Sequence, residues 1–152
     1  MSLLQKQMGK FPIGIWIAIA AILLLTIIAW LGQLYSLLDW EGAINLGLQN
    51  DRFDGDLAEQ TWALESWGVA MADMIWPFPL AIIALIGIFK HKFYGMIAAF
   101  MELAIGVYFP LFFAFQRWEL HLETVILALL LWTLPSLLGI IGLWKNRRFF
   151  EI

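Results

Sequence analysis

Four long apolar runs alternate with polar segments along this chain, over about residues 11–38, 62–89, 93–116 and 124–144. About 20 apolar residues in a helix span the hydrocarbon core of a bilayer, which is about 30 Å thick. A helix also satisfies its own backbone hydrogen bonds where water is absent. The pattern therefore predicts an all-α integral membrane protein, a bundle of four helices in a single membrane domain over residues 1–152.

The composition supports that class. Of the 152 residues, 62% are hydrophobic and 14% are charged, whereas soluble domains have about 45–50% apolar and about 25% charged residues. The sequence has no cysteine, which excludes disulfides, thiolate metal sites and cysteine nucleophiles. The first run is longer than the apolar region of a signal peptide, so we interpret it as an uncleaved helix.

Residues 39–60 are the one extended polar segment, and they predict an outer acidic loop. Residues 40–48 have the pattern of a short amphipathic helix in the headgroup region, and residues 50–56 have that of a turn. A single basic residue, Arg52, stands against six acids, which are Asp39, Glu41, Asp51, Asp54, Asp56 and Glu59. Their order does not match the calcium loop of an EF-hand, so we favour a solvated loop over a calcium site.

The basic residues are distributed unevenly over the connecting segments. Arg52 and Arg117 lie on one predicted side of the membrane, and seven of the nine Lys and Arg residues lie on the other. These seven are Lys6, Lys10, Lys90, Lys92, Lys145, Arg147 and Arg148. By the positive-inside rule, both termini are expected to be cytoplasmic. Short connections make neighbouring helices antiparallel, so we predict an up-down-up-down, multi-pass protein of the cell (inner or plasma) membrane.

The second run contains the features that suit lipid least. Glu65 and Asp73 are carboxylic acids within a span, where a central Asp costs about 2.5–3.5 kcal/mol on insertion scales. The sequence WPFP at residues 76–79 removes backbone donors and bends the helix. This helix is therefore expected to lie against neighbours that satisfy its polar groups.

The polar residues of neighbouring helices are expected to lie at similar depths and to form a polar seam inside the bundle. Folding the second and third helices back at His91 sets Asp73 level with about Phe109, and Glu102 level with about Leu80. The candidate members of the seam, which are also the candidate ligand-binding residues, are Glu65, Asp73, Trp76, Glu102, Tyr108, Thr133 and Ser136, with Gln33 from the first helix. Acids at this depth are candidates for a functional site. Equally, a protonated carboxyl can hold two helices together by hydrogen bonds.

Motifs for catalysis are absent from the sequence. It has no H-E-x-x-H pair, no nucleophile elbow and no histidine within a span to ligate haem. His121 falls in a wet loop between Glu119 and Glu123, which is a weak basis for a metal site. We expect no cofactor, no metal and no nucleic-acid partner. Gly139 and Gly142 offer a close-packing surface, either inside the bundle or toward a partner.

The order of acids and prolines resembles the layout of the EXPERA group, which includes a sterol isomerase and the sigma-2 receptor. The matching positions are Asp73, Pro77, Pro79, Glu102, Pro110 and Pro135. The resemblance implies four helices around a lipid-accessible cavity, with Asp73 and Glu102 facing a sterol-like or other amphiphilic cationic ligand. This chain lacks the intramembrane histidine that the isomerase would suggest.

Three functions are left open by the sequence. We favour a non-enzymatic bundle that acts as a subunit of a membrane complex or binds lipid or partner helices. The second is a binding protein or enzyme for a small hydrophobic molecule, with Asp73 and Glu102 as its polar contacts. The third is a proton-coupled oligomeric transporter in which Asp73 titrates. The expected partners are membrane lipids and either further copies of the chain or a larger membrane complex.

Overall fold

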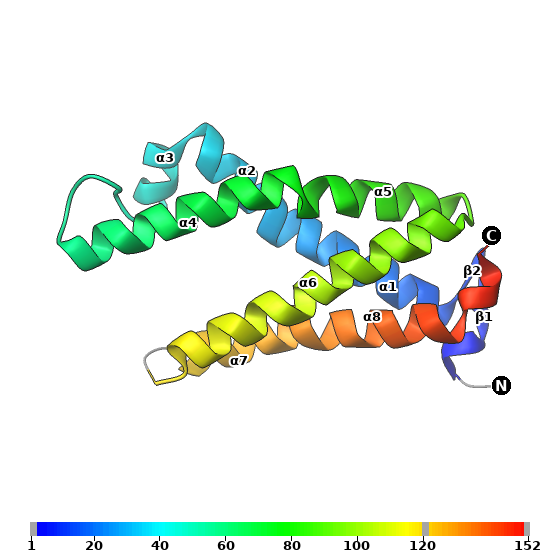
Figure 1. Cartoon of the computed structure of the whole chain (residues 1–152). Helices are drawn as coiled ribbons and strands as arrows, with labels where there is room; N and C mark the ends of the chain where they lie inside the picture. Colours follow the sequence, from blue (N-terminus) through cyan, green and yellow to red (C-terminus); the bar gives the residue numbers. More distant parts are fainter. Residues whose placement is uncertain (1–2, 120–121, 151–152) are drawn as a thin grey trace. The chain divides into compact units, whose positions relative to one another are not determined.

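The computed structural model describes residues 3–119 and 122–150 of the chain (Figure 1). It is 82% helical, and four helices within the described residues are long and apolar enough to cross a membrane. They are Ile13–Leu38, Leu57–Phe89, Phe93–Arg117 and Leu122–Lys145. These helices confirm the predicted all-helical class and indicate a multi-pass membrane protein.

The chain divides into two compact units. Unit 1 comprises Met1–Leu25 and Leu80–Ile152, and unit 2 comprises Thr26–Pro79. Unit 2 is therefore one continuous stretch of sequence. Unit 1, in contrast, is assembled from segments at the two ends of the chain.

Unit 1 contains most of the helical elements and a small β-ribbon. Its elements are η1 (Leu3–Gln5), β1 (Gln7–Met8), β2 (Phe11–Pro12), α1 (Ile13–Leu24), most of α5 (Pro77–Phe89), α6 (Phe93–Arg117), α7 (Leu122–Ala128), η3 (Leu129–Thr133), α8 (Leu134–Lys145) and η4 (Arg147–Phe149). In the ribbon, β1 and β2 are antiparallel, and Gly9 turns the chain between them at φ +67°. Glycine adopts this left-handed conformation without steric cost.

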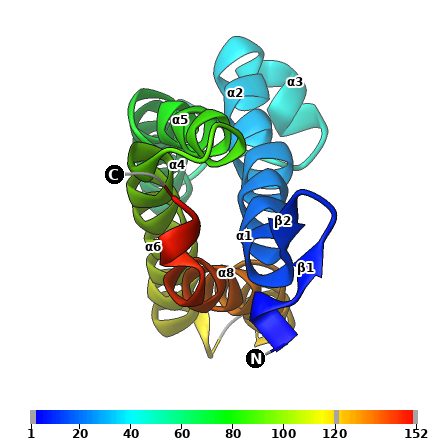
Figure 2. The same ribbon diagram turned by 90° about the vertical axis from the view of Figure 1, so that its right-hand side faces the viewer.

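Helix α8 packs against both α1 and α6 (Figure 2). A Cβ atom on Gly14 of α1 would lie 2.8 Å from the Cα atom of Gly142, and one on Gly139 would lie 3.1 Å from the Cα atom of Ala18. Such small residues let two helix backbones come into direct contact. Gly139 and Gly142 therefore pack inside unit 1.

Two prolines modify the helical hydrogen bonding of unit 1. Pro110 lies inside α6, and because it has no N–H, the carbonyl of Gly106 loses its usual helical donor. Pro135 follows the π-helical segment η3. In a regular helix its ring would clash with the carbonyl four residues earlier, and the wider π turns relieve that clash. The first span also contains a π-helical segment, η2 (Leu25–Trp30), without a proline.

A tight turn joins α5 to α6, as the sequence predicts. Lys92 N–H donates to the carbonyl of Gly87 and His91 N–H donates to that of Ile88, which together form a Schellman motif. His91 occupies the left-handed position, at φ 57°, where glycine is usual. The backbones of Gly87 and Gly95 come into contact just behind this turn.

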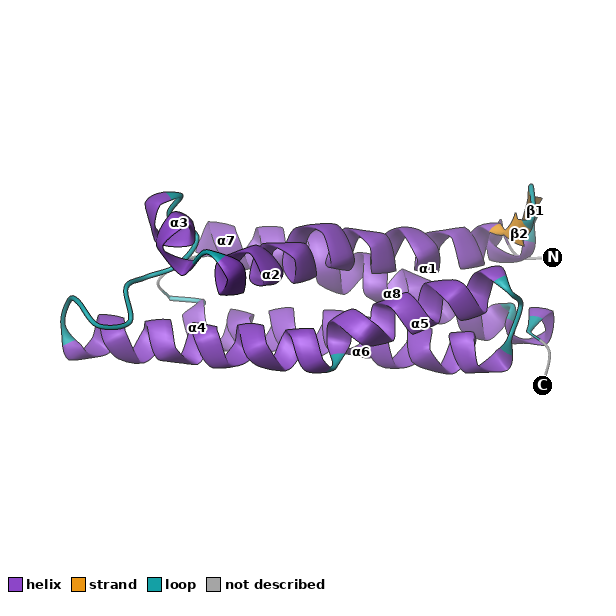
Figure 3. Cartoon of the chain, turned by 90° about the horizontal axis from the view of Figure 1, so that it is seen from above, coloured by secondary structure: helices purple, strands orange, loops and turns teal. Residues whose placement is uncertain are grey.

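Unit 2 contains the acidic segment and the helices on either side of it. Its elements are α2 (Leu31–Leu38), α3 (Trp40–Asn45) and α4 (Leu57–Ile75), preceded by most of η2. Helix α2 packs against α3 and lies alongside α4 (Figure 3). Helix α3 is shorter than the expected 40–48 because it ends in a Schellman motif, with Gly47 in the left-handed conformation at φ +70°.

The acids of this segment cap backbone N–H groups. The carboxylate of Asp39 accepts from Gly42 N–H at the start of α3. Asp51 accepts from the N–H groups of Phe53 and Asp54. Helix α4 begins at Leu57 rather than at Trp62 because a capping box precedes it, in which the carboxylate of Asp56 accepts from Glu59 N–H and that of Glu59 from Asp56 N–H.

The second span breaks at its prolines, as the WPFP sequence predicts. Helix α4 ends at Ile75 and α5 begins at Pro77. The residue between them, Trp76, still donates its N–H to the carbonyl of Ala72, but its backbone leaves the helical region at φ −120° and ψ −66°. A residue before proline is driven out of the helical conformation by the proline ring, which accounts for the break.

Candidate functional site

Three of the predicted polar residues lie together in the interior of unit 1. Glu102 of α6 and Ser136 of α8 are each 0% exposed, and Thr133, the last residue of η3, is nearly buried. Buried polar groups at membrane depth need hydrogen-bond partners, because lipid offers none. This group is therefore the part of the predicted seam that unit 1 assembles by itself.

The packing around this group is close. Gly106 lies one turn after Glu102 on α6, and a Cβ atom there would be 2.5 Å from the Oγ atom of Ser136 and 2.8 Å from the Cδ1 atom of Leu25. Glu102 and Gly106 are four residues apart and share one face of the helix. The carboxyl of Glu102 thus enters the interior at the same face of α6 that meets α8.

The hydroxyl groups of the cluster retain hydrogen-bonding capacity. Ser136 Oγ and Thr133 Oγ1 are buried and have no hydrogen-bond partner among the described residues. A helical serine or threonine usually donates to the carbonyl four residues earlier, and neither does so here. The cluster can therefore form further hydrogen bonds, either between helices or to a small polar group.

The remaining predicted acids lie on α4, in unit 2. Glu65 and Asp73 are eight residues apart, which separates them by about 12 Å along the helix axis. Glu65 is exposed, and Trp76, just beyond the helix, is 56% exposed. Within unit 2, no described residue forms a hydrogen bond or an ion pair with either carboxyl.

The full seam stays a prediction. Glu102, Thr133 and Ser136 belong to unit 1, whereas Glu65, Asp73, Trp76 and Gln33 belong to unit 2. Tyr108 is on α6 in unit 1 and its side chain is 70% exposed. Gln33, on α2, has a buried Oε1 atom without a hydrogen-bond partner in the described part of the chain.

Sequence reasoning missed an aromatic cage in unit 2. The guanidinium carbon of Arg52 lies 5.1 Å from the ring centroid of Trp40 and 5.3 Å from those of Phe53 and Trp67. Trp40 Nε1 donates to the carbonyl of Asn50, which fixes α3 to the following loop. Each such cation–π contact stabilises by about 0.5–1 kcal/mol at an exposed site. The signal in the sequence for this cage is Arg52, the single basic residue of a segment that also contains aromatic residues.

A shallow, open pocket of about 200 Å³ also lies in unit 2. It is lined by Gly47, Leu48, Gln49 and Asn50 from the loop and by Trp62 and Ser66 from α4. Its lining carries no acid and no histidine, so it offers no titratable group for catalysis. One of its lining residues, Gly47, is in the left-handed conformation that ends α3, at φ +70°.

Metal binding has no geometric support in the described residues. Over residues 3–119 and 122–150, no three His, Asp or Glu side chains are grouped so that they could hold a metal ion. His121 lies outside the described residues. His91 is used for packing, since its ring lies 4.4 Å from that of Phe149 and 5.5 Å from that of Phe11.

Comparison with known proteins identifies no relative of this chain. The chain matches no protein-family model, no curated protein and no solved structure. The resemblance to the EXPERA group rests on the layout of acids and prolines alone.

Proposed function

We propose that this chain is a non-enzymatic membrane protein that acts as a subunit of a membrane complex, with α4 as the helix that meets a partner helix. One observation carries the proposal. Asp73 lies within an apolar span, and no described residue of unit 2 gives it a hydrogen bond or an ion pair. An acid at membrane depth is stabilised when a neighbouring helix supplies that bond.

The surroundings of Glu102 support a structural use of polar groups in this protein. A methyl group on Gly106, one turn from Glu102, would meet the Oγ atom of Ser136 and the Cδ1 atom of Leu25, so these side chains would have to move. In membranes, close packing of small residues and interhelical hydrogen bonds drive helix association, because lipid removes the hydrophobic drive. Glu102 is thus proposed to hold α6 in place, while Asp73 is proposed to act between chains.

We further propose an up-down-up-down topology with both termini in the cytoplasm of a cell whose inner or plasma membrane contains the protein. The contacts of unit 1 support it, because Gly14 meets Gly142 while Ala18 meets Gly139. This order makes α1 and α8 antiparallel. The seven basic residues of the predicted inner side support the orientation.

The test is native mass spectrometry of the full chain extracted from its own membrane in mild detergent. The Asp73→Leu variant, which cannot hydrogen-bond, is compared with Glu41→Leu, which makes the same kind of change at an exposed carboxylate outside the spans. We expect wild type and Glu41→Leu to carry a partner subunit or a second copy, and Asp73→Leu to hold it about threefold to thirtyfold more weakly. An assembly that survives Asp73→Leu unchanged would overturn the proposal.

A second candidate function is binding of a small hydrophobic molecule with a polar head. The observation in its favour is the pair of buried hydroxyls on Thr133 and Ser136, which have no partner among the described residues. In the same spectra, a lipid-sized mass that is retained by wild type and lost in Glu102→Gln would favour this function. A protein partner lost only in Asp73→Leu would favour the first.

A further inference from the structure

Three segments that are far apart in the sequence meet at one end of unit 1. They are residues 3–12, the turn at 89–93 and the C-terminal residues 144–150. Phe11, which is buried, is the point of contact. Its ring centroid lies 5.6 Å from that of Phe89 in the turn and 5.7 Å from that of Phe149 near the C-terminus. Aromatic pairs at such distances stabilise by about 0.5–1.5 kcal/mol beyond their burial.

Hydrogen bonds fix the same segments to one another. Asn146 Nδ2 donates to the carbonyls of Leu4, at 3.0 Å, and Gly142, at 2.7 Å. Gln5 Nε2 donates to the carbonyl of Lys145 at 3.3 Å. The three segments are therefore joined by hydrogen bonds and ring contacts into one platform.

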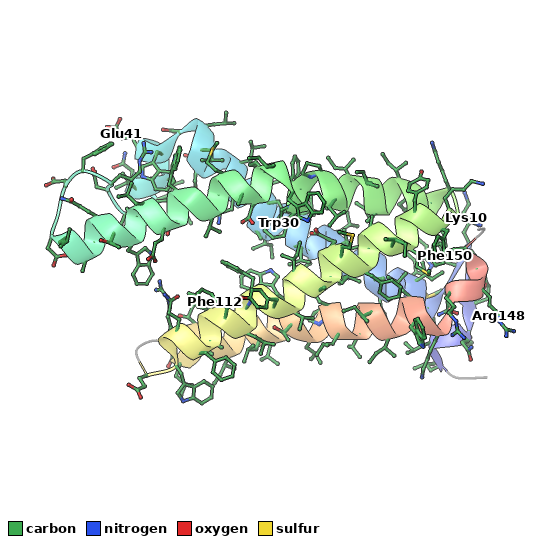
Figure 4. All side chains as sticks on the ribbon, viewed as in Figure 1. Lys10, Trp30, Glu41, Phe112, Arg148 and Phe150 are labelled. Carbon is green, nitrogen blue, oxygen red and sulfur yellow. The ribbon has the colours of Figure 1, made fainter. Side chains whose placement is uncertain are left out.

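This platform carries a dense positive charge. All seven of its Lys and Arg residues are exposed, and the described residues of the three segments include no Asp or Glu. We call these seven residues the basic face; they are Lys6, Lys10, Lys90, Lys92, Lys145, Arg147 and Arg148. In Figure 4, Lys10 and Arg148 lie at the same end of unit 1 as Phe150. Insertion topology requires positive charges near helix ends, but not that the fold join them on one platform.

Apolar side chains suited to a membrane interface surround the basic face. Phe93 and Tyr94 start α6 with exposed rings, and Trp144, near the end of α8, is 60% exposed. Arg147 links the two kinds of group, because its guanidinium carbon lies 4.8 Å from the Trp144 ring centroid and its Nη1 donates to the Trp144 carbonyl. Trp and Tyr are enriched at the level of lipid headgroups. Exposed Tyr94 and Trp144 rings beside the basic face therefore favour a location of its cations near the phosphate groups.

We propose that the basic face binds the phosphate headgroups of anionic phospholipids in the adjoining leaflet. Clusters of four to eight Lys and Arg residues beside membrane helices attract anionic lipid, within a Debye length of about 8–10 Å. The guanidinium groups of Arg147 and Arg148 can each bind a phosphate by donating two parallel hydrogen bonds. The inference goes beyond the proposed function: it concerns a different unit and stands whether or not α4 meets a partner.

The test uses the full chain in mild detergent, mixed with phosphatidylglycerol or phosphatidylcholine of the same acyl chains. Native mass spectrometry then counts the lipids retained. We expect wild type to retain phosphatidylglycerol in preference, and added salt to reduce that preference. In Lys10→Gln/Arg148→Gln the preference should fall, by about fivefold for each cation removed. Inorganic phosphate added together with the lipids should not displace the retained phosphatidylglycerol.

A matched control separates the basic face from net charge. Leu48→Glu/Asn50→Asp lowers the net charge by the same amount at two exposed positions of unit 2. It should retain the wild-type preference, and so should the charge-conserving Lys10→Arg. Equal retention of both lipids by wild type would overturn the proposal. So would an equal loss of preference in the control and in Lys10→Gln/Arg148→Gln.

Discussion

The contact between α1 and α8 allows a quantitative prediction for Gly14→Ala. The new Cβ atom would lie 2.8 Å from the Gly142 Cα atom, 2.8 Å from Asn146 Nδ2 and 3.0 Å from the Gly142 carbonyl oxygen. Ordinary contact begins near 3.4 Å, so the two backbones must separate by about 0.6 Å (3.4 minus 2.8). A gap of that size removes about a quarter to a half of the energy of each dispersion contact between α1 and α8.

The free energy of unfolding should therefore fall in Gly14→Ala. Overpacking of this kind costs about 1–3 kcal/mol, and loss of the Asn146 hydrogen bonds adds about 0.5–1.5 kcal/mol. Alanine returns at most about 1 kcal/mol of helix propensity, and less at the first turn, where Gly14 lies. The net loss of about 0.5–4.5 kcal/mol corresponds to a fall in Tm of about 1–18 °C.

The assay is thermal unfolding in detergent, followed by intrinsic tryptophan fluorescence. The control is Gly68→Ala on α4, since a Cβ atom there meets nothing within 4 Å and Tm should stay level or rise. Gly142→Ala should lower Tm like Gly14→Ala, and the double variant should lose less than the sum, because both changes open the same contact. A Gly14→Ala protein as stable as Gly68→Ala would refute the close approach of α1 and α8.

Two further predictions concern the ends of helices. Asp56→Ala removes the capping box of α4 and should destabilise its first turn by about 0.5–2 kcal/mol, seen as faster hydrogen exchange over residues 57–61; an unchanged exchange rate there would contradict the cap. His91→Gly relieves the left-handed backbone, by about 1 kcal/mol, but loses the tilted ring contact with Phe149. His91→Gly should therefore raise Tm in a Phe149→Leu background by more than in wild type, and equal effects in both backgrounds would show that this ring contact contributes nothing.

The four spans could be predicted because each rests on local hydropathy alone. The start of the second span was predicted at residue 62, which passed over the capping-box spacing of Asp56 and Glu59 before the apolar run. The expectation for residues 40–48 passed over a stop signal, because Gly47 can adopt the left-handed conformation that ends α3. Local rules therefore decide the helix bounds wherever the relevant side chain lies within a few residues.

The candidate site was less accessible to sequence reasoning. In the structure Ser136 lies close to Gly106 of α6, and a register counted along straight helices fixes such a neighbour only to about a turn. The cage around Arg52 had a weak signal, a single arginine among aromatic residues, whereas the platform around Phe11 depends on contacts between distant segments. Neither pattern specifies which rings meet, because these contacts arise from packing after the helices form.

The division of the sequence between the two units sets an order of assembly during synthesis. Unit 2 is continuous, so its parts emerge from the ribosome together and can pair at once. Helix α1 is synthesised before α8, along which it packs, and Phe11 must wait for Phe149. Helix α1 therefore stays without this neighbour until the fourth span has been synthesised and inserted.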